Sequence, residues 1–168
     1  GHGIDVGRCK PNPSLLRTST ILGVGRISPR KGLSEALDIV AALAIDYPES
    51  FTYVIMGEPR TACDHEYMAY LKQKVRDLRL EERVVWAGAV FDEEWLRAYQ
   101  SAAVLLSTSK TGSLDKVVLE ALACGTPVIA FGEEYRSYPG VQIVTSVQEA
   151  VACLKPFLQH SVTLMEAA

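Results

Sequence analysis

Short runs of apolar residues alternate along this chain with longer segments in which apolar residues recur every three or four positions. The short runs are rich in branched side chains, which is typical of buried parallel strands. The predicted strands lie at 20–25, 51–56, 84–90, 103–107, 127–131 and 141–144. The longer segments predict amphipathic helices at 32–46, 66–78, 92–99, 115–123 and 147–154, with Pro156 ending or kinking the last one.

This alternation predicts the α/β class, as a doubly wound, Rossmann-like parallel sheet of about six strands with helices on both faces. Sheets of this kind bind their ligands at the carboxyl ends of the strands. The turns that follow the strands are therefore the expected positions of functional residues.

Composition and charge narrow the choice of ligand. The 168 residues suit one domain, and 48% hydrophobic with 22% charged residues is typical of a folded protein. A net charge of −3 gives no field that would attract nucleic acid. No apolar run approaches the length of a membrane span, and the cysteines lack the spacing of a metal site. We therefore expect a cytoplasmic protein with free thiols and no metal or other cofactor, which would bind an anion in a local pocket.

The turn after the first predicted strand carries two cations. Gly25 permits close backbone approach to a ligand. Arg26 and Lys31 suit a diphosphate, because arginine binds oxygens through its planar fork and lysine supplies a compact charge. The dinucleotide motif G-x-G-x-x-G is incomplete, since Ser28 replaces its third glycine and no acidic residue follows at the expected distance. From this segment alone, a solvated loop with surface cations is an equal alternative.

A small polar loop at 107–115 leads from the fourth predicted strand into a helix N-terminus, where unpaired amides and the helix dipole favour an anion. Glu120 lies about one and a half turns into that helix, within an otherwise apolar stretch. A carboxylate in this place can accept hydrogen bonds from the vicinal hydroxyls of a ribose. The alternative is an ordinary exposed helix residue.

Three motifs together resemble a known family. They are G-x-G-R-x5-G at 23–32, G-A-V at 88–90 and V-L-E-A-L-A-C-G-T-P-V at 118–128. The chain resembles the C-terminal domain of the family 4, or group 1, glycosyltransferases, which have the two-domain GT-B architecture. Residues 2–5 resemble the hinge between the two domains, and the chain has no initiator Met. The resemblance implies that residues 1–168 are the nucleotide-sugar-binding domain and that the N-terminal acceptor domain is absent.

The resemblance also implies roles for individual residues. Arg26 and Lys31 match the basic pair that neutralises the donor diphosphate as the nucleotide leaves, so they are the expected catalytic residues. Glu120 matches the glutamate that holds the ribose hydroxyls. The other expected donor-binding residues are Gly25, Val90 at the place of backbone contacts to the base, and the loop that faces the sugar and phosphates, Gly112, Ser113, Leu114 and Asp115.

The chain departs from the family pattern at one position. The family has a second glutamate eight positions before the ribose glutamate, and here that position is Gly112. Asp115 would also lie close to a phosphate, or it would cap the helix. The acid that contacts the sugar and the identity of the donor stay open.

The expected reaction is the transfer of a sugar from a UDP- or GDP-linked donor to an acceptor hydroxyl, with retention, as in hexosyltransferases. The isolated domain is expected to bind donor weakly and to be inactive without the N-terminal domain, through which any peripheral membrane contact would be made. A non-catalytic nucleotide-binding module of the same fold is the alternative, which Gly112 favours and Arg26, Lys31 and Glu120 disfavour. An NAD-dependent oxidoreductase is the third and weakest interpretation.

Overall fold

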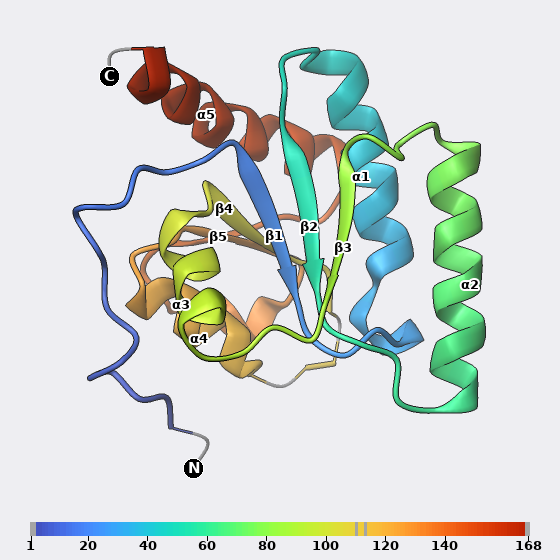
Figure 1. Ribbon diagram of the computed structural model, residues 1–168, viewed down its shortest axis with the longest axis horizontal. Helices are drawn as coiled ribbons and strands as arrows, with labels where there is room; N and C mark the ends of the chain where they lie inside the picture. Colours follow the sequence, from blue (N-terminus) through green and yellow to red (C-terminus); the bar gives the residue numbers. More distant parts are fainter. Residues whose placement is uncertain (1–2, 110, 113, 167–168) are drawn as a thin grey trace.

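A computed structural model of the chain describes residues 3–109, 111–112 and 114–166, with the backbone alone for 160–166. Within these residues lie six strands: β1 (Thr20–Val24), β2 (Thr52–Met56), β3 (Val84–Gly88), β4 (Val104–Ser107), β5 (Val128–Ala130) and β6 (Val141–Ile143). They form one parallel sheet in the order β3–β2–β1–β4–β5–β6 (Figure 1). The predicted doubly wound, Rossmann-like class is confirmed.

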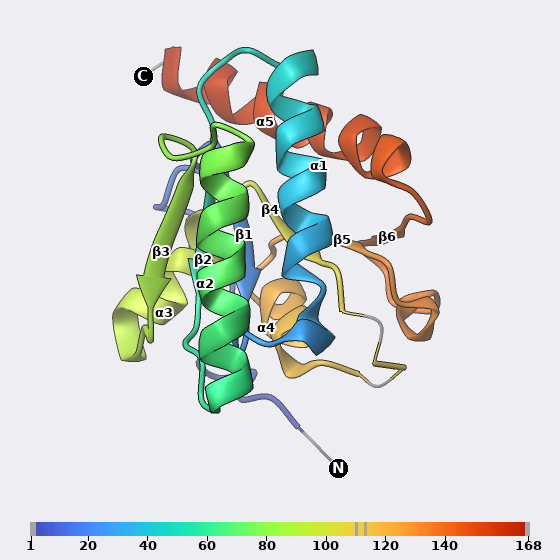
Figure 2. The ribbon, with the colours of Figure 1, turned by 90° about the vertical axis from the view of Figure 1, so that its right-hand side faces the viewer.

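Helices cover both faces of the sheet. The helices on one face are α1 (Leu33–Asp46), α2 (Ala62–Asp77) and α5 (Val147–Glu166), and Figure 2 views the molecule from the side of α1 and α2. The helices on the other face are α3 (Asp92–Ser101) and α4 (Lys116–Ala123) (Figure 1). Two 3-10 turns, η1 (Pro29–Lys31) and η2 (Glu133–Tyr135), follow β1 and β5. None of the described helices combines the length and the apolar composition that a membrane span requires.

Alternate residues of each central strand face two separate cores. In β1, Ile21 packs with residues of α1, α2 and α5, whereas Leu22 packs with residues of α3 and α4. In β4, Leu106 and Leu105 divide in the same way. Each of these fully buried side chains contributes about 1.5–3 kcal/mol of hydrophobic stabilisation. Because both faces are buried, the strands are continuous apolar runs in the sequence without polar alternation.

The strand order reverses between the neighbours β1 and β4. The chain leaves β1 for α1 on one face of the sheet and leaves β4 for α4 on the other face. The divergence of these two connections opens a crevice at the carboxyl ends of β1 and β4, which is the usual ligand position in doubly wound sheets. The turns that carry Lys31 and Asp115 meet at this crevice.

The N-terminal segment, residues 3–19, runs along the side of the sheet that α3 and α4 cover (Figure 1). The guanidinium of Arg17 donates hydrogen bonds to the carbonyl oxygen of Ala102 at 2.6 Å and to Oγ1 of Thr126 at 2.7 Å. Nε2 of Gln100 donates to the carbonyl oxygen of Lys10 at 2.7 Å. These contacts fix the segment beside α3 and α4.

The second helix begins earlier than predicted, at Ala62 and not at residue 66. Thr61 and Asp64 form a capping box, in which each backbone N–H donates to the side chain of the other residue at 3.2 Å. The side chains between them, Ala62 and Cys63, are exposed, so the first turn carries no apolar periodicity.

The last helix continues through Pro156, so of the two predicted alternatives, an end or a kink at this proline, the end was wrong. Leu154 and Leu158, on either side of the proline, are fully buried in the core shared with α1. We infer that this packing outweighs the cost of an interior proline, about 3 kcal/mol or more.

Candidate functional site

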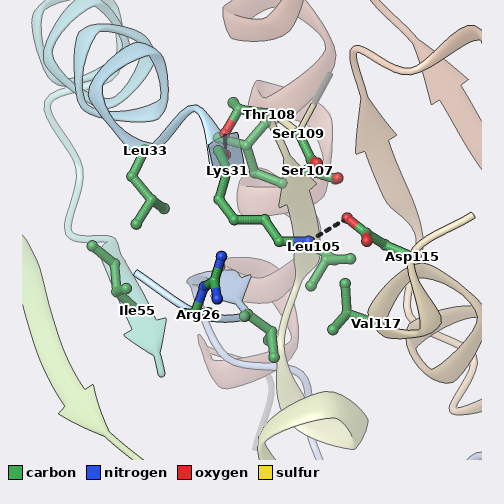
Figure 3. A pocket seen from close by; sticks show the side chains of 14 residues that line it. Arg26, Lys31, Leu33, Ile55, Leu105, Ser107, Thr108, Ser109, Asp115 and Val117 are labelled. Carbon is green, nitrogen blue, oxygen red and sulfur yellow. Dashed lines mark hydrogen bonds and ion pairs between the residues drawn. The ribbon is translucent and has the colours of Figure 1, made fainter. Parts of the chain in front are cut away.

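The crevice between β1 and β4 holds a small cavity with an apolar floor and a polar side (Figure 3). Its polar side is made by residues after β1 and residues after β4, and includes Gly25, Arg26, Lys31, Thr108, Ser109 and Asp115. The remaining space is about 20 Å³, which is room for roughly one water molecule. The side chains of Lys31 and Asp115 thus nearly fill the position that a ligand would take.

Close approach of the strand ends brings the turn after β1 beside the turn after β2. The N–H of Gly25 donates to the carbonyl oxygen of Met56 at 2.9 Å. The N–H of Gly57 donates to the carbonyl oxygen of Gly88 at 2.8 Å. Gly57 has φ +147°, and a Cβ there would overlap the carbonyl oxygen of Gly25. Glycine at position 57 is therefore required for the position of Arg26, which follows Gly25 directly.

Lys31 and Asp115 form an ion pair across the crevice. Nζ of Lys31 lies 2.7 Å from Oδ2 of Asp115, and their side chains are 25% and 18% exposed (Figure 3). The carbonyl oxygen of Lys31 accepts a hydrogen bond from Oγ1 of Thr108 at 2.9 Å. The N–H of Asp115 donates to Oη of the buried Tyr135 at 2.7 Å, and burial raises the pKa of this tyrosine to about 12. Asp115 occupies the N-cap position of α4, but its carboxylate makes no capping hydrogen bond and binds Lys31.

Arg26 also has an acidic partner, which the sequence analysis missed. Nε of Arg26 lies 3.7 Å from Oδ2 of Asp64, whose side chain is only 6% exposed. Burial alone would raise the pKa of Asp64, but hydrogen bonds from the N–H groups of Arg60 and Thr61 and the charge of Arg26 lower it overall. The spacing of Thr61 and Asp64 ahead of an apolar helix is a capping-box signal that could have indicated this residue.

Glu120 lies on α4 beside a second cavity, of about 540 Å³. Oη of the buried Tyr99 donates to Oε2 of Glu120 at 3.2 Å, and burial together with the Glu120 charge raises the pKa of Tyr99. The cavity is also lined by Val90 and Trp95 and, from the N-terminal segment, by Arg8. The tyrosine fixes one carboxylate oxygen of Glu120 on a wall of this cavity.

A third cavity, of about 290 Å³, shares walls with the other two. It shares Gly25 and Arg26 with the crevice and Val90 and Trp95 with the Glu120 cavity. The three cavities therefore adjoin one another. Arg26, Lys31 and Asp115 line the first, and Glu120 lines the second together with Arg8 and Lys116.

The remaining predicted residues belong to the loop before α4. Gly112 and Leu114 are exposed, and neither lines any of the three cavities. A Cβ added at Gly112 would meet no atom within 4 Å. Ser113 lies outside the described residues. The structure thus brings Gly25, Arg26, Lys31 and Asp115 together and places Val90 and Glu120 on adjoining cavities.

Comparison with known proteins identifies relatives. A family model described as glycosyl transferases group 1 matches residues 10–137. Mannosylfructose-phosphate synthase from Agrobacterium fabrum is 29% identical over 110 residues, which are 65% of this chain and 24% of that protein. The chain spans about a quarter of the length of the first curated relatives that it matches.

Solved structures share the fold. The C-terminal domain of a glycosyl transferase group 1 family protein (LpcC) from Francisella tularensis superposes with a TM-score of 0.76 at 21% identity, covering 94% of this chain and 88% of that one. Anabaena HepE in complex with UDP-glucose superposes with a TM-score of 0.75 at 21% identity, covering 95% of this chain and 47% of that one.

The Asp64 carboxylate should stabilise the fold in a pH-dependent way. Since its pKa is lowered by folding, its contribution is present above the unfolded value, about pH 4, and is lost as the pH falls through the folded value. We expect Asp64→Asn to lower the urea midpoint at pH 7, with a difference from wild type that narrows at pH 3. Asp46→Asn, which removes the exposed pair with Lys155, is the matched control and should change little. An Asp64→Asn effect of equal size at both pH values would contradict this assignment.

Proposed function

This chain belongs to the group 1 glycosyl transferases, and from that premise we propose that it supplies the donor site of a retaining, hexosyltransferase-like enzyme. The observation that carries the proposal is the convergence of Arg26, Lys31 and the start of α4 on one crevice at the reversal of strand order. Cations beside helix amides are suited to a diphosphate. A nucleotide sugar provides such a group between a ribose and a hexose.

The two cations would act on the leaving group. When the bond between the anomeric carbon and the phosphate oxygen breaks, negative charge develops on the diphosphate, and Arg26 and Lys31 would bind this charge. In the structure Arg26 is paired with Asp64 and Lys31 with Asp115. Donor binding is therefore an exchange of partners for both cations. We assign no metal ion or other cofactor to this step.

The two larger cavities would hold the nucleoside. Glu120, oriented by Tyr99, presents a carboxylate to the ribose hydroxyls, and Val90 and Trp95 offer apolar surface to the base. Gly112 and Leu114 line none of the three cavities, so in this proposal they would face the donor sugar from outside them. The fold neighbour HepE binds UDP-glucose, which supports a UDP-linked donor, with a GDP-linked donor as the other choice.

The acceptor site would lie in an N-terminal domain of the same polypeptide. This chain covers 88% of the C-terminal domain of LpcC but only 47% of HepE, which supports the assignment of residues 1–168 to one half of a two-domain enzyme. Retention of configuration, the acceptor hydroxyl, a cytoplasmic location and any membrane contact through the N-terminal domain are parts of this proposal. Closure of two domains around the donor would exclude water from the reaction.

A non-catalytic nucleotide-binding module is the second candidate. Gly112, at the position of the family's second glutamate, is exposed and offers no carboxylate to a sugar. Such a module would bind a nucleoside diphosphate and its sugar conjugate equally, whereas a transferase would gain affinity from the sugar. A thermal-shift panel of UDP, GDP, ADP and their glucose or mannose conjugates separates the two candidates, because a ligand of the folded state raises its Tm.

The first test of the site is Lys31→Ala. Loss of a charge-assisted contact should weaken binding of the preferred nucleoside diphosphate by about 1–3 kcal/mol in calorimetry at constant salt. Lys155→Ala, which removes a lysine paired with Asp46 at a distant site, is the control and should bind as wild type does. Unchanged affinity of Lys31→Ala would exclude its role at the diphosphate.

The second test concerns Glu120. If its carboxylate accepts hydrogen bonds from the ribose, Glu120→Gln should weaken binding of the ribonucleotide more than binding of the 2′,3′-dideoxy analogue. Measuring the ribonucleotide and its dideoxy analogue on both wild type and Glu120→Gln isolates the contribution of the ribose hydroxyls to binding. Equal weakening of both ligands would show that Glu120 acts through the fold or through general electrostatics.

The third test is transfer itself. The isolated chain should bind donor in the micromolar to millimolar range, because only one side of the ligand is covered, and should transfer no sugar. Incubation with a radiolabelled nucleotide sugar and an acceptor extract measures this, and the two-domain protein provides the comparison. Efficient transfer by the isolated chain would contradict the two-domain mechanism.

A further inference from the structure

A carboxylate lies inside a cavity that otherwise carries the features of an anion site. Oδ2 of Asp115 is 2.7 Å from Nζ of Lys31, and both side chains are mostly buried. Water screens such a charge only partly, so any phosphate that binds Lys31 also feels the charge of Asp115. The carboxylate is therefore part of the ligand environment of the crevice.

Asp115 cannot easily move out of this environment. Its N–H is bound to Oη of Tyr135 at 2.7 Å, and its carbonyl oxygen accepts a hydrogen bond from the N–H of Val118 at 3.1 Å in the first turn of α4. Tyr135 is itself 1% exposed. These two hydrogen bonds fix the backbone N–H and carbonyl groups of Asp115. Rotation of the side chain therefore moves the carboxylate within the crevice but leaves it close to Lys31.

The Asp115 carboxylate holds the place next to Nζ of Lys31, at 2.7 Å, and little free space is left between the two side chains. A ligand phosphate that contacts Nζ takes over part of that place. The two anions then compete for one lysine at short range, and the outcome depends on the charge that the phosphate carries.

The donor, a nucleotide sugar, and the product, a nucleoside diphosphate, differ in the charge of this phosphate. The terminal phosphate of a nucleoside diphosphate has a second ionisation with a pKa of about 6, so it carries close to two negative charges at pH 7.5. In a nucleotide sugar the same phosphate is esterified and carries one. The displaced carboxylate repels the doubly charged group more strongly, and it can accept hydrogen bonds from the hydroxyls of a sugar in that place.

We propose that Asp115 is a specificity-determining residue, which makes the crevice favour a nucleotide sugar over the free nucleoside diphosphate. This inference rests on the proposed donor site. Cleavage of the bond between the anomeric carbon and the phosphate oxygen converts the favoured ligand into the disfavoured one. Asp115 thereby promotes release of the nucleotide product.

The test is the ratio of two dissociation constants, for UDP and UDP-glucose, measured by calorimetry at pH 7.5. Asp115→Asn keeps the shape and removes the charge, so it should tighten UDP binding roughly tenfold and change UDP-glucose binding much less. Asp115→Glu keeps the charge and should retain a ratio close to that of wild type. Asp46→Asn, which breaks the Lys155 pair (2.9 Å) away from the crevice, is the matched control and should leave the ratio unchanged.

Three outcomes overturn the inference. If wild type binds both UDP and UDP-glucose and Asp115→Asn leaves the ratio of their dissociation constants unchanged, the inference is wrong. The proposed donor site is not contradicted by that result. Weaker UDP binding by Asp115→Asn also overturns the inference, because it makes the carboxylate a support for the nucleotide. Absence of binding of UDP, UDP-glucose and their guanosine counterparts by wild type and Asp115→Asn overturns the proposed donor site and this inference with it.

Discussion

The reversal of strand order between β1 and β4 is the constraint on which the site depends. It sends α1 and α4 to opposite faces of the sheet, and it leaves the carboxyl ends of the two strands open between them. Lys31 and Asp115 are 84 positions apart in the chain, yet their charged groups meet at 2.7 Å because each follows one of these two strands. The close backbone approach at Gly25 and Gly57 then sets Arg26 at the same edge. The fold creates the site with few local requirements beyond these.

Charge balance is the second property of the site. Each cation of the crevice has an acidic partner from another element, Asp64 at the start of α2 for Arg26 and Asp115 before α4 for Lys31. Asp64 is buried, whereas the Arg26 side chain is 43% exposed, so removing Arg26 would leave the buried carboxylate without its cation. In the proposed donor site, a diphosphate would replace these existing partners, and part of its interaction energy would compensate for the pairs that it breaks.

The sequence predicted the sheet, because strand runs buried on both faces and helices with an apolar face leave periodic signals. It singled out Arg26, Lys31 and Glu120 because they lie in turns or motifs of recognisable spacing; the structure places them on neighbouring cavities, and their roles stay predictions. The pairing of Arg26 with Asp64 and of Lys31 with Asp115 could not be predicted, since it depends on tertiary contacts over long sequence separations. The continuation of α5 past Pro156 was not predicted, for a related reason. Local propensity favours an end or a kink at a proline, whereas the burial of Leu154 and Leu158 depends on tertiary packing.

The N-terminal segment forms part of the Glu120 cavity. Arg8 stacks over the ring of Trp95 at 5.6 Å and pairs with Asp92 at 3.3 Å, and both partners belong to α3. Arg8 also lines the cavity of Glu120, where Trp95 and Val90 form the apolar wall. A displacement of this segment would thus alter the cavity proposed for the nucleoside, while the crevice of Lys31 and Asp115 is built from the ends of β1 and β4 and the turns that follow them. The N-terminal segment therefore shapes the Glu120 cavity without lining the crevice of Lys31 and Asp115.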